Sequence, residues 1–132
     1  MKPSAVASQG LTFDAGMLVA LDRGDRAQWA RLERAIKQGV CPTVPAPVVA
    51  QVWRSPRQVR LARALKICKV ESTDLSLSVE AGRLLAKTGT ADAVDAIVVA
   101  SAARRGDAIV TSDGVDVSRL AVFVKGVTVL RS

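Results

Sequence analysis

The sequence predicts a three-layer α/β/α sandwich built around a mainly parallel central sheet. Short apolar runs of strand length alternate with helical segments along the whole chain, which is typical of parallel sheets covered by helices. Apolar residues make up 49% of the 132 residues, enough for a packed core. No repeat or change in composition divides the chain. We therefore expect a single domain over residues 1–132, with a loose polar N-terminus over residues 1–10.

The first part of the chain predicts one strand and two helices. Leu11–Phe13 is a short apolar run and is expected as a strand, followed by a brief helix over residues 15–21. Asp25 is a good N-cap for a helix over residues 26–38, because its carboxylate can accept from the free N–H groups of the first turn. Gly39 is expected to end that helix.

Prolines divide the middle of the chain. Residues 40–44 are strand-like and stop before a proline. The segment Pro47–Arg54 is expected as a helix, since proline suits a first turn. Pro56 introduces another predicted helix that continues to about Leu65.

The remaining elements follow the same alternation. A strand is expected over residues 67–70, and then a helix that Asp74 or Ser76 caps and that ends near Gly89. A further helix begins at Asp92.

That last helix ends at Arg104–Arg105–Gly106, where the two cations suit the negative end of the helix dipole. The apolar run over residues 108–111 predicts a strand. A short helix over residues 117–121 and a final strand over residues 127–130 complete the chain.

Composition excludes several kinds of chemistry. The 19 basic and 12 acidic residues give a net charge of +7, which favours nucleic acid or another acidic partner. With no histidine, Ser-His-Asp and Cys-His catalysis and histidine-based zinc sites are excluded. Cys41 and Cys68 are expected to be small buried thiols. Neither a signal peptide nor a run long enough to span a membrane is visible, so we expect a cytoplasmic protein.

Four aspartates stand where predicted strands end or helices begin: Asp14, Asp92, Asp95 and Asp113. In parallel sheets ligands bind beyond the carboxyl ends of the strands, where Asp14 and Asp113 are expected. Converging carboxylates can hold Mg²⁺, which prefers oxygen ligands. The alternative is that Asp92 is only an N-cap and Asp113 only a turn residue. Asp95 precedes an apolar stretch and is expected to be buried, where a charge needs a partner.

The segments that carry these aspartates resemble a known family. Residues 13–21 resemble the opening strand–Asp–helix of PIN-domain ribonucleases, and residues 94–102 and 109–113 resemble the family's later Asp-Ala helix and its strand ending in Thr-Ser-Asp. The order and spacing are similar to those of VapC-type toxins of bacterial toxin–antitoxin pairs. The resemblance implies a PIN-like domain, a Mg²⁺- or Mn²⁺-dependent endoribonuclease activity, an antitoxin partner and a homodimer.

The resemblance also implies roles for individual residues. Asp14, Asp95 and Asp113 look like metal ligands, Asp92 like a further acidic catalytic member and Asp116 like a neighbour of the site. Thr111 and Ser112 are placed to contact RNA, or else are ordinary residues at a strand end.

Gln51 departs from the family pattern, because members commonly carry a glutamate in this helix. An amide brings no negative charge, so the site should bind a cation less tightly. A non-catalytic module that binds RNA or protein is therefore the alternative. A phosphoacceptor domain is disfavoured, because Asp14 stands alone after its strand and no lysine follows the late one.

Two further sets of residues bear on partners. Arg54, Arg57, Arg60 and Arg63 recur every three residues, and those beyond Pro56 are expected on one side of a helix, as an RNA-binding stripe or as a solvated face. Trp29 and Trp53 lie where VapC-like proteins grip the antitoxin, although core packing is the more common fate of tryptophan.

Overall fold

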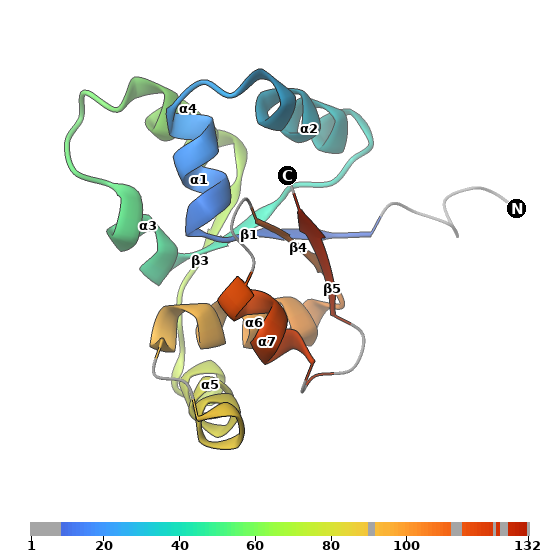
Figure 1. The fold of residues 1–132 in the computed structure, drawn as a ribbon. Helices are drawn as coiled ribbons and strands as arrows, with labels where there is room; N and C mark the ends of the chain where they lie inside the picture. Colours follow the sequence, from blue (N-terminus) through green and yellow to red (C-terminus); the bar gives the residue numbers. More distant parts are fainter. Residues whose placement is uncertain (1–8, 90–91, 112–114, 123, 125–126, 132) are drawn as a thin grey trace, which may run out of the picture.

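Parallel strands form the central sheet, in the order β3-β2-β1-β4-β5 (Figure 1). The computed structural model describes residues 9–89, 92–111, 115–122, 124 and 127–131. The strands are β1 (Leu11–Phe13), β2 (Thr43–Pro45), β3 (Lys69–Glu71), β4 (Ala108–Thr111) and β5 (Thr128–Arg131). All four pairings between neighbouring strands are parallel, which confirms the expected sheet.

Helices cover both faces of this sheet and complete the predicted three layers (Figure 1). One layer holds α1 (Ala15–Asp22), α2 (Arg26–Lys37), α3 (Ala46–Val52) and α4 (Val59–Ile67). The other holds α5 (Leu75–Thr88), α6 (Ala93–Arg105) and α7 (Val115–Ala121).

The core lies where β1 and β4 are sandwiched between α1 and α6. Phe13, Leu18, Val98 and Ile109 are fully buried there. Central strands of a parallel sheet are covered on both faces, which explains why β4 (Ala-Ile-Val-Thr) is buried at every position rather than at every second one.

The predicted helix after Pro56 starts later than expected, at Val59, so Arg57 precedes it. The reason is Gln58, whose Oε1 accepts from the backbone N–H groups of Arg54 and Ser55 at 2.5 and 3.0 Å. Its Nε2 donates to the carbonyl of Val52 at 2.9 Å. These bonds stabilise a loop where the sequence pattern predicts a helical turn.

Neighbouring boundaries shift as well. Because α4 continues to Ile67, β3 begins only at Lys69, and its N–H donates to the carbonyl of Pro42 at 2.8 Å. Asp74, and not Ser76, caps α5, since its Oδ1 accepts from the Leu77 N–H at 2.8 Å.

The two cysteines have different environments, and the expectation that both are buried is wrong for Cys41, which is exposed. Cys41 precedes β2 and donates to the carbonyl of Ile67 at 3.4 Å. Cys68 is buried, and this burial, with a smaller effect of Cys41, raises the pKa of its thiol to about 12. Among the described residues, no helix combines the length and apolar character that a membrane span requires.

Candidate functional site

The order of the strands defines where a ligand site belongs. From β1 the chain moves to β2 and β3 on one side, and then returns to place β4 on the other side of β1. The carboxyl ends of β1 and β4 therefore flank the point where the strand order reverses, and open α/β sheets bind ligands there. Asp14 follows β1 directly, and its N–H donates to the carbonyl of Val110 at 3.4 Å. The buried Thr111 ends β4 at the same edge.

Asp14 is a buried acidic side chain at this edge, with 4% of its surface exposed. It caps α1, because its Oδ1 accepts from the Met17 N–H at 3.0 Å. Asp25 and Asp74 make the same kind of cap on α2 and α5 but are exposed. Burying a carboxylate costs free energy that an exposed cap avoids. Capping alone therefore does not account for the position of Asp14.

Two further predicted residues lie at the start of α6. Asp92 is its N-cap, and its Oδ1 accepts from the Asp95 N–H at 2.9 Å. The last residue of α6, Arg105, contacts Asp107, which lies just before the start of β4. Because α6 is about 20 Å long and ends at the amino edge of the sheet, its first turn lies toward the carboxyl edge. Asp92 and Asp95 thus lie toward the edge that carries Asp14.

The expectation that Asp95 is deeply buried is wrong. Asp95 is half-buried and Asp92 is exposed, while the fully buried positions of α6 are Ala96, Val98 and Val99. Asp95 lies in the first turn, before the helix passes under the sheet, so water can reach it. Its charge therefore needs less compensation than the sequence pattern indicates.

Several predicted site residues lie outside the part of the chain that the structure describes. Ser112 and Asp113 are among them, and Asp116 belongs to α7 with its side chain not described. Gln51 is exposed on α3, a helix that contacts α6. Within the described ranges, no group of three or more Asp, Glu or Cys side chains is arranged to hold a metal ion.

Two members of the predicted arginine stripe make contacts within the protein. The Arg54 guanidinium donates to the carbonyls of Ala50 and Trp53 at 3.0 and 2.8 Å, so it ends α3 rather than facing a ligand. Arg63 stacks over the Trp29 ring, with its guanidinium carbon 5.5 Å from the ring centre. All four arginines are exposed.

The two tryptophans differ. Trp29 is partly buried against the core, and its indole N–H donates to the carbonyl of Leu21 at 2.9 Å, which agrees with core packing. Trp53 is 37% exposed at the end of α3, so core packing is not its role.

A buried polar network under α6 was not predicted from the sequence. The Arg105 guanidinium donates to Asp107 Oδ2 at 2.9 Å and to Thr12 Oγ1 at 2.8 Å, and it also pairs with Glu71. Thr12 Oγ1 donates to Asp107 Oδ2 at 2.8 Å, and Ser101 Oγ donates to Glu71 Oε1 at 2.5 Å. These groups join β1, β3, β4 and α6. The sequence signal for this network is Arg105-Gly106-Asp107, in which two opposite charges flank the glycine that ends α6, directly before the buried strand β4.

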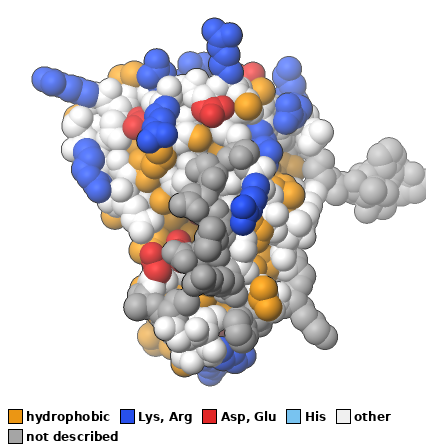
Figure 2. All heavy atoms as spheres, in the orientation of Figure 1, with side chains coloured by type: hydrophobic (Ala, Val, Ile, Leu, Met, Phe, Trp, Pro, Cys, Tyr) orange, Lys and Arg blue, Asp and Glu red, His pale blue; other side chains and the backbone are white. Residues whose placement is uncertain are grey.

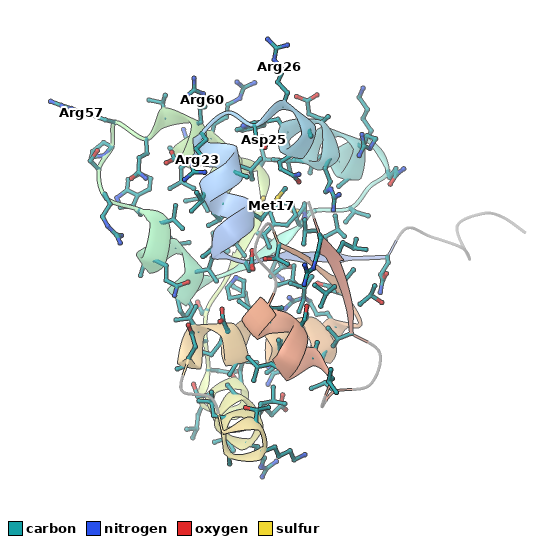
Figure 3. The ribbon with its side chains drawn as sticks, in the orientation of Figure 1. Met17, Arg23, Asp25, Arg26, Arg57 and Arg60 are labelled. Atoms are coloured by element: carbon teal, nitrogen blue, oxygen red, sulfur yellow. The ribbon has the colours of Figure 1, made fainter. Side chains whose placement is uncertain are left out.

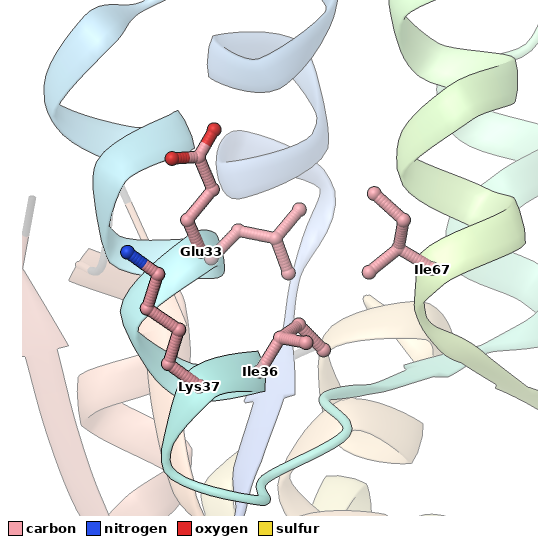
Figure 4. Close-up of a pocket in the computed structure, with 5 residues that line it drawn as sticks. Glu33, Ile36, Lys37 and Ile67 are labelled. Atoms are coloured by element: carbon pink, nitrogen blue, oxygen red, sulfur yellow. The ribbon is translucent and has the colours of Figure 1, made fainter.

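An apolar groove of about 300 Å³ lies on the other helical layer (Figure 4). Ile36 of α2 and Ile67 of α4 face each other across it, with Glu33 and Lys37 at its rim. Ile36 is 41% exposed, although isoleucine is among the residues most often buried. The groove is separate from Asp14, which lies at the far end of α1.

Comparison with known proteins agrees with this arrangement. The model of the PIN domain family matches residues 11–122, nearly the whole chain. The comparison with curated protein sequences gives no match.

Several solved structures share the fold. The structure of VapBC2 from Rickettsia felis bound to a promoter DNA fragment matches with a TM-score of 0.69 at 14% identity, over 93% of this chain and 98% of that one. A toxin–antitoxin complex from Klebsiella pneumoniae gives 0.68 at 18% identity, over 89% and 95%. VapC20 from Mycobacterium tuberculosis, a toxin that cleaves the sarcin–ricin loop, gives 0.61 at 16% identity, over 88% and 97%.

The matched family segment includes β1 with Asp14, α6 with Asp92 and Asp95, and β4. By this match the chain belongs to the PIN domain family.

Proposed function

We propose that this protein is a metal-dependent endoribonuclease and the toxin of a toxin–antitoxin pair. The observation that carries the proposal is Asp14, a buried carboxylate at the strand-order reversal of a PIN domain. Asp92 and Asp95, at the start of α6, supply further negative charge toward the same edge. In a chain with net charge +7, acidic residues gathered at one edge fit a cation that works on a polyanion.

The donor set fits Mg²⁺ or Mn²⁺, because both ions take carboxylate oxygen ligands. Asp14, Asp95 and Asp113 are the proposed metal ligands. Asp92 is proposed as a further catalytic residue that orients the attacking water or adds negative charge near the ion. Thr111, Ser112 and Asp116 are proposed neighbours. When bound, such an ion lowers the pKa of a water and neutralises charge at the scissile phosphate. The chain itself holds Asp14 through the Met17 cap and shields it from bulk water.

The Asp14→Asn variant tests this proposal. Asparagine caps a helix about as well as aspartate, so α1 should stay intact while the negative charge is lost. We expect cleavage of a mixed bacterial RNA pool in Mg²⁺ or Mn²⁺ to fall by at least about a hundredfold, within the range for removing a group that stabilises charge.

The matched control is Asp74→Asn, which changes the same kind of N-cap at an exposed site away from Asp14. It should cleave like the unaltered protein. Equal activity of both variants, together with activity in EDTA, would refute the metal-dependent mechanism.

Gln51 favours a second candidate, a PIN domain that binds RNA or a protein without cutting. The side chain is exposed on α3, which contacts α6, and it lacks the charge that a glutamate would bring. The Gln51→Glu variant separates the candidates. If the unaltered chain is inert and this variant cleaves RNA, the binding-only role is correct; if the unaltered chain already cleaves, that role fails.

An antitoxin is the proposed protein partner, supported by the toxin–antitoxin complexes that share the fold. The groove between Ile36 and Ile67 offers an apolar surface for a short amphipathic segment. We expect Ile36→Glu to weaken co-purification with a co-expressed upstream reading frame. Val59→Glu should not, because Val59 is also exposed but lies outside the groove. A homodimer is also proposed, and sedimentation of the purified chain tests it. Such a nuclease would act on cytoplasmic RNA.

A further inference from the structure

The tertiary structure places arginines that are distant in sequence along one end of the molecule, where Arg57 projects to one side and Arg26 upward, with Arg23 and Arg60 between them (Figure 3). Arg23 ends α1, Arg26 begins α2, Arg57 precedes α4 and Arg60 lies on α4; we call these four residues the arginine corner. All four are exposed. Figure 2 shows Lys and Arg side chains projecting around this upper part of the surface, with carboxylates and apolar side chains between them.

Specific contacts hold the corner together. Gln58, next to Arg57, donates to Asp22 Oδ2 at 3.3 Å and ties the loop before α4 to the end of α1. The side chain of Arg60 packs against the turn between α1 and α2, where a Cβ added at Gly24 would stand 2.9 Å from the Arg60 Nε. Gly24 has a φ of +78° and no side chain, so the turn leaves room for this guanidinium.

The positive charge of the corner is offset only in part, by the neighbouring Asp22 and Asp25. Among the described residues the ion pairs involve Arg104 and Arg105, and none involves the four arginines of the corner. The nearest carboxylates have other partners: Asp22 accepts from Gln58, and Asp25 Oδ1 accepts from the Gln28 N–H at 3.1 Å. The four guanidinium groups outnumber these two carboxylates and form no ion pair with the described residues, and their planar donors match phosphate oxygens.

We propose that the arginine corner binds the phosphate backbone of the RNA strand, away from the cut site. This inference rests on the proposed nuclease function and deepens it. Asp14 and Arg23 flank α1, so the corner lies roughly 13 Å along the helix from the carboxylates. A strand crossing from the corner to Asp14 would be held by backbone contacts that carry no sequence information. The corner therefore favours long substrates.

The test is binding of a labelled single-stranded RNA of roughly 20 nucleotides, measured in EDTA so that no cleavage occurs. Replacing Arg23, Arg26, Arg57 and Arg60 together with glutamine should weaken binding by about tenfold or more. The slope of log affinity against log salt should fall by about 3, because each lost contact to a single strand contributes about 0.7.

The control replaces four other exposed cations with glutamine and so changes the net charge equally: Lys69, Arg83, Lys87 and Arg131. It should retain most of the affinity and the slope. If the corner variant loses no more affinity than this control, the proposal is wrong.

Cleavage gives a second readout that separates this proposal from the nuclease function. On the long RNA, the corner variant should show a raised KM with little change in kcat, and on a dinucleotide it should cut like the unaltered chain. An unaltered chain that binds RNA through the corner but never cuts would overturn the nuclease and keep the corner. A fall in kcat on both substrates would contradict the corner as a remote binding surface.

Discussion

Asp14 shows how one side chain can serve structure and chemistry together. As an N-cap it needs only an oxygen that accepts from Met17, which asparagine or serine would also provide. Its burial beside the end of β4 is what separates it from the exposed caps Asp25 and Asp74. The same residue thus starts a helix and places a charge at the edge of the sheet.

Gly10 is a residue whose importance depends on one close approach. A Cβ added there would stand 2.1 Å from Asp107 Oδ1, so that carboxylate would have to move from the network it forms with Thr12 and Arg105. We expect Gly10→Ala to lower the free energy of unfolding by about 1–3 kcal/mol in urea denaturation. Gly82→Ala is the control, since Gly82 lies in α5 with no atom within 4 Å of the added Cβ, and it should stabilise by about 0.5–1 kcal/mol. Two variants of equal stability would contradict the close approach at Gly10.

The cysteines should differ in reactivity by their burial. Cys41 is exposed, whereas burial raises the pKa of Cys68 to about 12 and keeps it a thiol. Because the thiolate is the reactive form, N-ethylmaleimide should modify one site rapidly in the native protein and two after unfolding, as measured by mass spectrometry.

The same shift has a consequence for stability. The folded state holds the Cys68 proton more tightly than the unfolded state does. The protonated thiol therefore makes its full contribution to the free energy of unfolding below pH about 9, and this contribution is lost as the pH rises toward 12. Cys68→Ser should lack that alkaline loss. Rapid native modification of both thiols would show that Cys68 is not enclosed.

At the scale of elements, Arg105 fastens α6 to the sheet. Its guanidinium bonds Asp107 and Thr12 and pairs with Glu71, and all these side chains are largely shielded. We expect Arg105→Ala to lower the free energy of unfolding by roughly 2–4 kcal/mol, because Glu71 and Asp107 lose their cationic partner. Thermal denaturation measures the loss.

The neighbouring Arg104 provides the control for that prediction. Its contacts with Asp74 and Glu80, both at 3.7 Å, lie on the surface, so Arg104→Ala should cost less than about 1 kcal/mol. Similar losses in the two variants would mean that the network under α6 contributes little.

At the scale of the whole molecule, a site made from several elements should couple metal binding to folding. A ligand that binds only the folded state stabilises it by about 2.7 kcal/mol at a hundredfold excess over its Kd. We expect Mn²⁺ to raise the Tm of the unaltered chain and EDTA to reverse the rise, while Asp14→Asn shows a smaller shift. An equal shift in Asp14→Asn and in Asp74→Asn would show that the ion binds elsewhere.

Local patterns were sufficient to predict most elements of the fold. Asp25 and Asp92 cap helices where expected, and Gly89 and Gly106 end theirs with positive φ. These are contacts within a few residues, which the sequence alone specifies. The start of α4 was missed because Gln58 bonds backbone groups of the preceding loop, a choice that propensity does not encode.

Burial and pairing depended on contacts between distant segments. The sequence predicted Asp14, Asp92 and Asp95 as a candidate set, and the order of strands places them toward one edge of the sheet. It overestimated the burial of Asp95, because how far a helix start extends beyond the sheet depends on packing. It also grouped Arg54 and Arg63 with Arg57 and Arg60, although the first two already have partners within the protein.

The sequence by itself determined the α/β class, the helix caps and the family motifs, since periodicity and capping act over a few neighbouring residues. Tertiary structure decided that β1 lies between β2 and β4, and that Arg105 contacts Thr12 and Glu71, which lie 93 and 34 residues before it. It also decided that arginines from separate segments lie at one end of the molecule, with Arg60 against the turn at Gly24. Those outcomes depend on which surfaces pack together. Packing is a property of the folded chain as a whole, so no local pattern contains it.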